Sequence, residues 1–172
     1  MLTNKWTKLP DLNTKRNFHS SIAFKNRYIY VVAGFNGGQR TNMIERLDMK
    51  TTSTYMVWTT IDLKMKNSSA LSWICLEGCG LHTIEEDKIL IFGGFTSSDQ
   101  KSNQCFIFDP FKNEIDEIES KTRTVSNFYQ RQPKVSSDGK LYCVETNTLD
   151  LHIFDVKNRE WSIVTKQQIG WR

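Results

Sequence analysis

The segment from Lys88 to Phe95, with the sequence KILIFGGF, constrains the fold more than any other part of this chain. Its apolar run from Ile89 is too short for a helix, which needs about ten residues or more. A short apolar run that ends in glycines predicts a strand buried on both faces. The paired Gly93 and Gly94 permit a sharp turn or the close approach of a neighbouring backbone. The sequence therefore predicts a buried strand followed by a tight turn.

This segment is repeated along the chain. A copy lies upstream at Tyr28–Phe35, and a partial copy without the glycines lies downstream at Lys140–Val144. Aligned on the second glycine, the units fall at Gly34, Gly94 and Thr146, in steps of 60 and 52 residues. A period of about 50 residues with four short strands per unit is typical of a propeller-type repeat array. We therefore expect an all-β fold.

Each unit shows the same order of signals. Two strand-like segments joined by a short polar turn come first and predict a hairpin. In the first unit the strand Phe18–Phe24 precedes the turn at Lys25–Arg27, and in the second the turn lies at Glu85–Asp87. A polar loop and a third strand follow, and a fourth strand ends the unit. The third strand of each unit ends in an aspartate, at Asp48, Asp109 and Asp155. The fourth strand carries a large apolar residue, at Trp58, Ile115 and Trp161. We expect one domain over residues 1–172, with units at about 14–62, 79–119 and 128–165.

These features resemble the kelch-repeat family. That family has a glycine pair after the second strand, an aspartate at the end of the third and a tryptophan in the fourth, and Arg16 and His19 match its leading Arg-x-x-His element. Ala33 replaces one glycine, the third unit lacks both, and Ile115 replaces one tryptophan. The resemblance implies a partial kelch-type β-propeller of three four-stranded antiparallel blades. It also implies that Trp6 belongs to a strand at a blade edge.

Three blades do not close a ring, because propellers have about four to eight. We therefore expect apolar blade faces at both ends of the array, and such faces attract partners. Self-association and completion by further blades are both compatible with this expectation.

Composition narrows the classes of partner. The net charge of +4 comes from scattered residues without a run of like charges, so we expect binding to neither nucleic acid nor membrane surfaces. The sequence has no apolar stretch of about 18 residues and no signal-peptide pattern at its start. We expect a cytoplasmic location with reduced cysteines.

Catalytic and metal chemistry find little support. Cys75, Cys79 and His82 have a spacing that zinc sites tolerate, but the sequence offers no evident fourth ligand. The three histidines, His19, His82 and His152, all lie in predicted strands without a nucleophile motif beside them. We expect no metal, no cofactor and no catalytic residue.

Binding residues are expected on the loops between second and third strands and on the linkers between blades. These segments gather on one face of a propeller, and arginine and aromatic side chains are common interface anchors. The candidates are Arg16, Phe35, Arg40, Phe95, Lys101 and Arg123. For Phe35 and Phe95 core packing is the competing interpretation, and for Arg40 and Lys101 it is a simple solvated charge.

The family resemblance implies a non-enzymatic protein–protein interaction module, such as a substrate-recognition or adaptor scaffold, whose protein partner the sequence does not identify. Two alternatives stay open. One is a remnant of a propeller enzyme, similar to sugar oxidases or sialic-acid epimerases. The other is a part-propeller that another chain completes.

Overall fold

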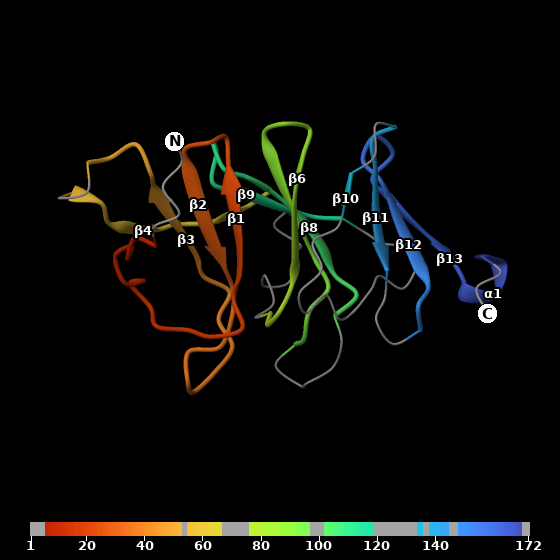
Figure 1. Ribbon diagram of the computed structural model, residues 1–172, viewed down its shortest axis with the longest axis horizontal. Helices are drawn as coiled ribbons and strands as arrows, with labels where there is room; N and C mark the ends of the chain where they lie inside the picture. The colour runs from red at the N-terminus through yellow and green to blue at the C-terminus, as the bar shows by residue number, and fades with distance from the viewer. Residues whose placement is uncertain are drawn as a thin grey trace.

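Three β-sheets follow one another along the chain. The computed structural model describes residues 6–52, 55–66, 76–96, 102–118, 134–135, 138–144 and 148–169. The first sheet has the order β1-β2-β3-β4, the second β5-β9-β8-β7-β6 and the third β10-β11-β12-β13. Figure 1 shows the sheets side by side in a row, from the first in red and orange to the third in blue. The fold is all-β and consistent with partial kelch propeller blades, as predicted.

The strands are short, with two to five residues each. The first sheet contains β1 (Ser20–Phe24), β2 (Tyr28–Val32), β3 (Ile44–Asp48) and β4 (Trp58–Thr60). The second contains β5 (Lys64–Met65), β6 (Gly80–Ile84), β7 (Lys88–Phe92), β8 (Cys105–Asp109) and β9 (Glu114–Glu117). The third contains β10 (Lys134–Val135), β11 (Lys140–Val144), β12 (Leu151–Asp155) and β13 (Glu160–Val164), and a short helix α1 (Lys166–Ile169) follows it.

The predicted hairpins are confirmed in the first two sheets. β1 pairs with β2 up to Phe24 and Tyr28, and β6 pairs with β7 up to Ile84 and Lys88. The turn residues Lys25 and Asn26 both have positive φ, at 53° and 49°, and so do Glu85 and Glu86. Two successive residues of positive φ are the geometry of a type I′ turn, whose twist matches that of the flanking strands.

The aspartate that ends each third strand has a structural role. Its side chain accepts backbone N–H groups of the following turn: Asp48 from Lys50 at 3.0 Å, Asp109 from Phe111 at 3.0 Å and Asp155 from Asn158 at 2.9 Å. This local bond favours the turn over continued strand. The repeated aspartate is thus explained by the turn between the third and fourth strands.

Most of the core lies between neighbouring sheets. One cluster joins the first two sheets, and there the rings of Tyr30 and Phe108 meet edge to face at 5.7 Å. A second cluster joins the second and third sheets, where Trp161 lies 5.3 Å from Phe92 and 5.0 Å from Phe154, centroid to centroid. Each sheet therefore depends on its neighbour to exclude water from its apolar face.

Three strand predictions need correction. The second sheet has five strands rather than four, because β5 in the linker pairs in parallel with β9. Lys64 N–H donates to Asn113 O at 2.8 Å there. β1 starts at Ser20 rather than at Phe18, whose φ of 51° is incompatible with a strand. Trp6 lies outside any strand and its side chain is fully exposed, so the predicted strand at this residue is wrong.

The outer face of the first sheet is covered by the segment that precedes β1. Val31, Leu47 and Trp58 are buried there, with Leu9 and Leu12 packed against them. The Trp58 indole N–H also donates to Pro10 O at 2.9 Å. The expectation of open apolar faces at both ends of the array is therefore wrong for this end.

Candidate interaction face

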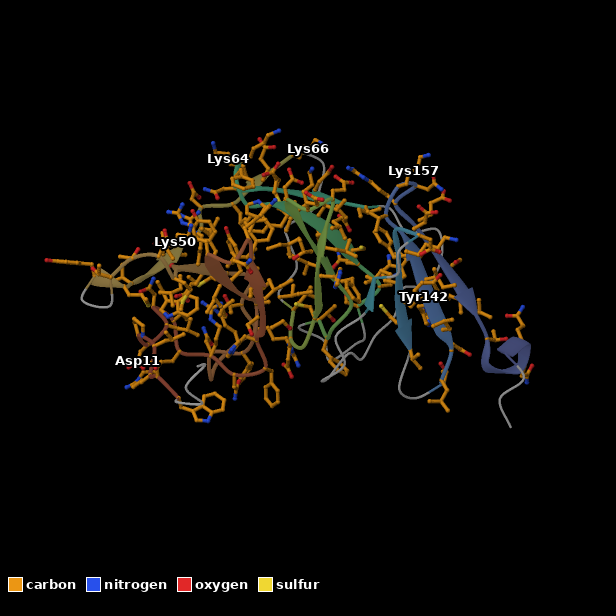
Figure 2. The ribbon with its side chains drawn as sticks, turned by 45° about the horizontal axis from the view of Figure 1, so that its top comes forward. Asp11, Lys50, Lys64, Lys66, Tyr142 and Lys157 are labelled. Carbon is orange, nitrogen blue, oxygen red and sulfur yellow. The ribbon has the colours of Figure 1, made fainter. Side chains whose placement is uncertain are left out.

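The β2–β3 loop and the described part of the β7–β8 loop lie along one edge of the row of sheets, at the bottom of Figure 1. The β1–β2 and β6–β7 hairpin turns lie along the opposite edge. That opposite rim carries Lys50, Lys64, Lys66 and Lys157 in Figure 2, whereas Asp11 lies on the other side. We use the name loop face for the edge formed by the β2–β3 loop, the described part of the β7–β8 loop, residues 6–19 before β1 and residues 76–79 before β6.

Two glycines let each loop approach the linker of its own unit. Gly34 has φ 106°, and a Cβ there would lie 2.7 Å from Asn17 O and 3.0 Å from the His19 Cα. Gly94 has φ 87°, and a Cβ there would lie 2.7 Å from the Glu77 carbonyl oxygen. Real Cβ atoms do not come this close to backbone, so both positions need glycine for space as well as for conformation. The sequence prediction of close backbone approach is confirmed.

The base of each loop is fixed by the same hydrogen bonds. Asn17 and Phe35 exchange two backbone bonds of 2.8 Å, and Glu77 and Phe95 exchange bonds of 3.1 and 2.9 Å. Across the loop, Thr41 N–H donates to Gly34 O at 2.8 Å, and Ser102 N–H makes the matching bond to Gly94 O at 2.7 Å. The two loops therefore leave the sheets in the same way.

Further bonds connect the loop of the first sheet to the linker of the second. Gly34 N–H donates to Leu76 O at 2.9 Å, and Gly78 N–H donates to Phe18 O at 2.9 Å. Arg40 Nε lies 2.8 Å from a carboxylate oxygen of Glu77, and both side chains are largely buried. These contacts fix neighbouring units relative to each other, so the loop face is a preorganised surface.

Arg16 is not at this surface. Its side chain is 0% exposed and forms an ion pair with Glu45, which is also 0% exposed. The guanidinium donates further to Ala33 O at 3.2 Å and to Met43 O at 3.0 Å. Glu45 in turn accepts the backbone N–H groups of Asn13 and Thr14. The prediction that Arg16 is a binding anchor is corrected, because its donors are used inside the fold, where they join the linker to β3.

The other predicted residues differ in their placement. Phe35 and Phe95 are half-buried at equivalent positions of the two loops, so each combines packing with a partly accessible ring. Arg40 lies on the loop face but pairs with Glu77 rather than being an ordinary solvated charge. Lys101 and Arg123 lie outside the described residues. The binding role of these residues stays a prediction.

The structure adds Phe18 to the candidates. Its side chain is 53% exposed, and its carbonyl accepts the Gly78 N–H on the loop face. The sequence prediction missed it because the apolar pattern placed Phe18 inside a strand. Nearby, Asn36 Oδ1 accepts the N–H groups of Gly38 at 3.2 Å and Gln39 at 3.0 Å. This bonded turn is an exposed polar loop tip that directly follows Phe35.

The ionisable groups of the described residues offer little for catalysis. Burial raises the pKa of the Cys79 thiol to about 11, and burial raises the pKa values of Cys105 and Cys143 to about 12. These thiols are protonated near neutral pH and are therefore poor nucleophiles and metal ligands. His82 lies in a groove of about 510 Å³ between β1 and β6, where burial lowers its pKa.

Cys75, the other cysteine of the possible zinc cluster, lies outside the described residues. Among those described, no group of three or more His, Cys, Asp or Glu side chains is arranged to hold a metal ion. Within the same part of the chain, no helix is long and apolar enough to span a membrane.

The repeated strand order, the glycines that close β2 and β7 and the turn-capping aspartates define a repeat protein made of propeller-type sheets. The sequence profile of the Kelch motif matches residues 16–53, from the linker before β1 to the turn after β3. The all-β fold and this motif match agree with the resemblance to the kelch-repeat family.

Among characterised proteins, the chain is similar to Kelch-like protein 15 of Homo sapiens and of Mus musculus. Each is 25% identical to it over 190 residues, which include 97% of this chain. The chain spans 29% of the length of these relatives.

Proposed function

We propose that this chain is a non-enzymatic protein-interaction module whose protein partner binds the loop face. The observation that carries the proposal is the repeated, hydrogen-bonded attachment of loop to linker, which fixes the backbone at Phe35 and Phe95 and binds the Phe18 carbonyl to the linker of the second unit. Rigid aromatic residues beside polar groups are typical of the energetically dominant part of interfaces. The free, buried thiols of Cys79, Cys105 and Cys143 suit a reducing compartment such as the cytoplasm.

The finer part of the proposal is a substrate-recognition or adaptor role within a larger assembly. Its support is the similarity to Kelch-like protein 15, of which this chain matches only a part. Propeller folds also carry enzymes, so the fold alone does not decide between these classes.

The test is quantitative capture of proteins from a cell lysate by matched variants. Phe18→Ala with Gln39→Arg alters the exposed part of the loop face, and Lys50→Glu alters the opposite rim. Loss of one anchor residue should weaken the binding of a true partner by about 2 kcal/mol, which raises the dissociation constant roughly thirtyfold. Support requires a protein that the wild type and Lys50→Glu retain and the loop-face variant loses.

Equal capture by all three proteins would count against the loop face as the binding site. Turnover of a sugar substrate by the purified chain would instead favour the remnant of a propeller enzyme. Thermal melting of each variant provides the control that the fold is intact.

A further inference from the structure

The tip of the β2–β3 loop carries an asparagine followed by a glycine, Asn36 and Gly37. This loop is drawn in orange below the first sheet in Figure 1, and residues 36–39 at its tip are all exposed. The backbone nitrogen of a residue that follows asparagine can attack the side-chain amide carbon, Cγ, and close a five-membered ring. Because both reacting groups belong to one chain, the reaction needs no encounter between molecules. How the loop holds the two groups therefore decides whether the ring forms.

The attacking group would be the Gly37 nitrogen, and the structure leaves it accessible. Gly37 is exposed, and a Cβ added there would meet no atom within 4 Å. Within the described part of the chain no group accepts its N–H, whereas the Asn36 N–H donates to Gln39 O at 3.1 Å. A glycine also has no side chain that screens its own nitrogen. The nitrogen is therefore open to reaction.

The group under attack is the Asn36 side-chain amide, and two backbone groups polarise it. Asn36 Oδ1 accepts the N–H groups of Gly38 at 3.2 Å and Gln39 at 3.0 Å. When a nitrogen adds to Cγ, negative charge develops on Oδ1, and these two donors already face that oxygen. Fixed donors that face an oxygen gaining charge are the arrangement of an oxyanion hole. The loop thus exposes the attacking nitrogen and activates the amide.

Other exposed asparagines lack this combination. Asn36 is the only asparagine of the chain that a glycine follows. The nitrogen after Asn26 belongs to Arg27 and donates to Phe24 O at 3.1 Å, so it is engaged in the hairpin turn. Asn17 is exposed on the same loop face, but a phenylalanine follows it. These asparagines serve as internal controls.

From these observations we propose that Asn36 is a site of spontaneous modification, at which its side-chain amide is lost through a ring formed with Gly37. The Gly37 nitrogen gives its proton to solvent and forms a bond to Asn36 Cγ. The bond from Cγ to Nδ2 breaks, and Nδ2 takes up a proton and leaves as ammonia. Water then opens the resulting succinimide. Attack at Cγ gives aspartate, and attack at the Asn36 backbone carbonyl carbon gives isoaspartate. No atom changes its oxidation state, and water is the only co-reactant.

The modification changes the tip of the loop and leaves its base closed. Both products carry a carboxylate where the chain has a neutral amide, and isoaspartate also lengthens the backbone by one carbon. The Thr41 N–H bond to Gly34 O and the bridge between Phe35 and Arg40 close the loop behind the tip. We therefore expect the change to be confined to residues 36–39. The proposal does not depend on the proposed function, because the reaction needs only this chain and water.

Incubation of the folded chain, followed by peptide mapping with mass spectrometry, tests the proposal. The peptide that contains Asn36 should gain the mass of an amide-to-acid change, whereas the peptides with Asn17 and Asn26 should not. An isoaspartyl methyltransferase should label the Asn36 peptide of the incubated chain. The rate should rise with pH, because base removes the proton from the attacking nitrogen. Asn36→Gln should lose both signals, because the longer side chain does not close a five-membered ring.

The two glycines of the tip provide a matched pair of variants. Gly37→Ala puts a methyl group beside the attacking nitrogen and should slow the reaction by about tenfold or more. In Gly38→Ala the new Cβ would meet only Asn36 Oδ1, at an ordinary 3.9 Å, and the N–H donor is kept. Gly38→Ala should therefore leave the rate unchanged. Thermal melting shows whether both variants are folded.

The same chain unfolded in guanidinium chloride shows what the loop contributes. Because two donors activate the amide in the folded chain, Asn36 should convert there at least as fast as in the unfolded chain. Three outcomes would overturn the proposal. They are slower conversion of Asn36 in the folded chain than in the unfolded one, equal conversion of Asn17 or Asn26, and equal rates for Gly37→Ala and Gly38→Ala.

Discussion

Replacing the second glycine of the pair should destabilise the fold far more than replacing the first. In Gly94→Ala the new Cβ would lie 2.7 Å from Glu77 O, and φ is 87°. The backbone conformation costs about 1–3 kcal/mol for a residue with a side chain. Forcing a methyl group against a fixed backbone adds about 1–3 kcal/mol. We therefore expect Gly94→Ala to lower the free energy of unfolding by about 2–6 kcal/mol.

The chain supplies its own controls. Ala33 already occupies the position equivalent to Gly93, with a φ of 57° against 64° for the glycine. Gly93→Ala should therefore lower the free energy of unfolding by only about 1 kcal/mol. Gly37 has φ 92°, but a Cβ added there would meet no atom within 4 Å, so Gly37→Ala isolates the backbone contribution.

Urea denaturation followed by circular dichroism measures these differences. With a slope of about 2 kcal/mol/M, Gly94→Ala should shift the urea midpoint by roughly 1–3 M and Gly93→Ala by about 0.5 M. Equal shifts for the two variants would refute the close-approach explanation. A shift for Gly37→Ala as large as that for Gly94→Ala would assign the whole effect to backbone conformation.

Three further predictions concern charged and titratable groups. Arg16→Met should destabilise the fold by about 3–5 kcal/mol because it leaves Glu45 buried without its cation, and the double variant with Glu45→Met should lose less in urea denaturation. A double-mutant cycle with Arg40→Ala and Glu77→Ala should give a coupling energy of about 1–2 kcal/mol, and additive effects would show that the ion pair does not join the units. Burial holds the pKa of His82 in the folded chain below its usual value of 6.5. The stability that neutral His82 contributes is therefore complete above pH 6.5 and is lost as the pH falls through the lower pKa of the folded state. His82→Gln should therefore make the melting temperature less dependent on pH between about pH 7 and 5. If the pH dependence is the same as in the wild type, the assignment to His82 is wrong.

The repeated pattern predicted the sheets because it reflects backbone requirements that are local. The pairs Gly34 and Gly94, and Asp48 and Asp109, each occupy a turn with fixed geometry, so the sequence shows what the turn needs. The parallel strand β5 could not be predicted in this way. Its pairing with β9 depends on where the linker crosses the edge of the second sheet, which is a long-range property.

The candidate site was harder to predict for a related reason. Arg16 has the sequence character of a surface anchor, and only the three-dimensional fold shows that Glu45 and two carbonyl groups bind its guanidinium. Phe18 shows the opposite error, because a single residue of positive φ turns an apparently strand-buried ring toward solvent. Whether a single side chain is buried or exposed depends on the local backbone conformation, which the spacing of apolar residues in the sequence does not reveal.

Leu9 and Leu12 cover the outer face of the first sheet, so the two ends of the array are not equivalent. A repeat appended beyond the third sheet would face the outward-pointing residues of β11 and β12, among which Val144 is 37% exposed. One inserted before β1 would first have to displace packed leucines and the hydrogen bond between Trp58 and Pro10. Adding repeats to such modules should therefore succeed after the third sheet and fail before β1. This difference between the two ends is a practical rule for engineering them.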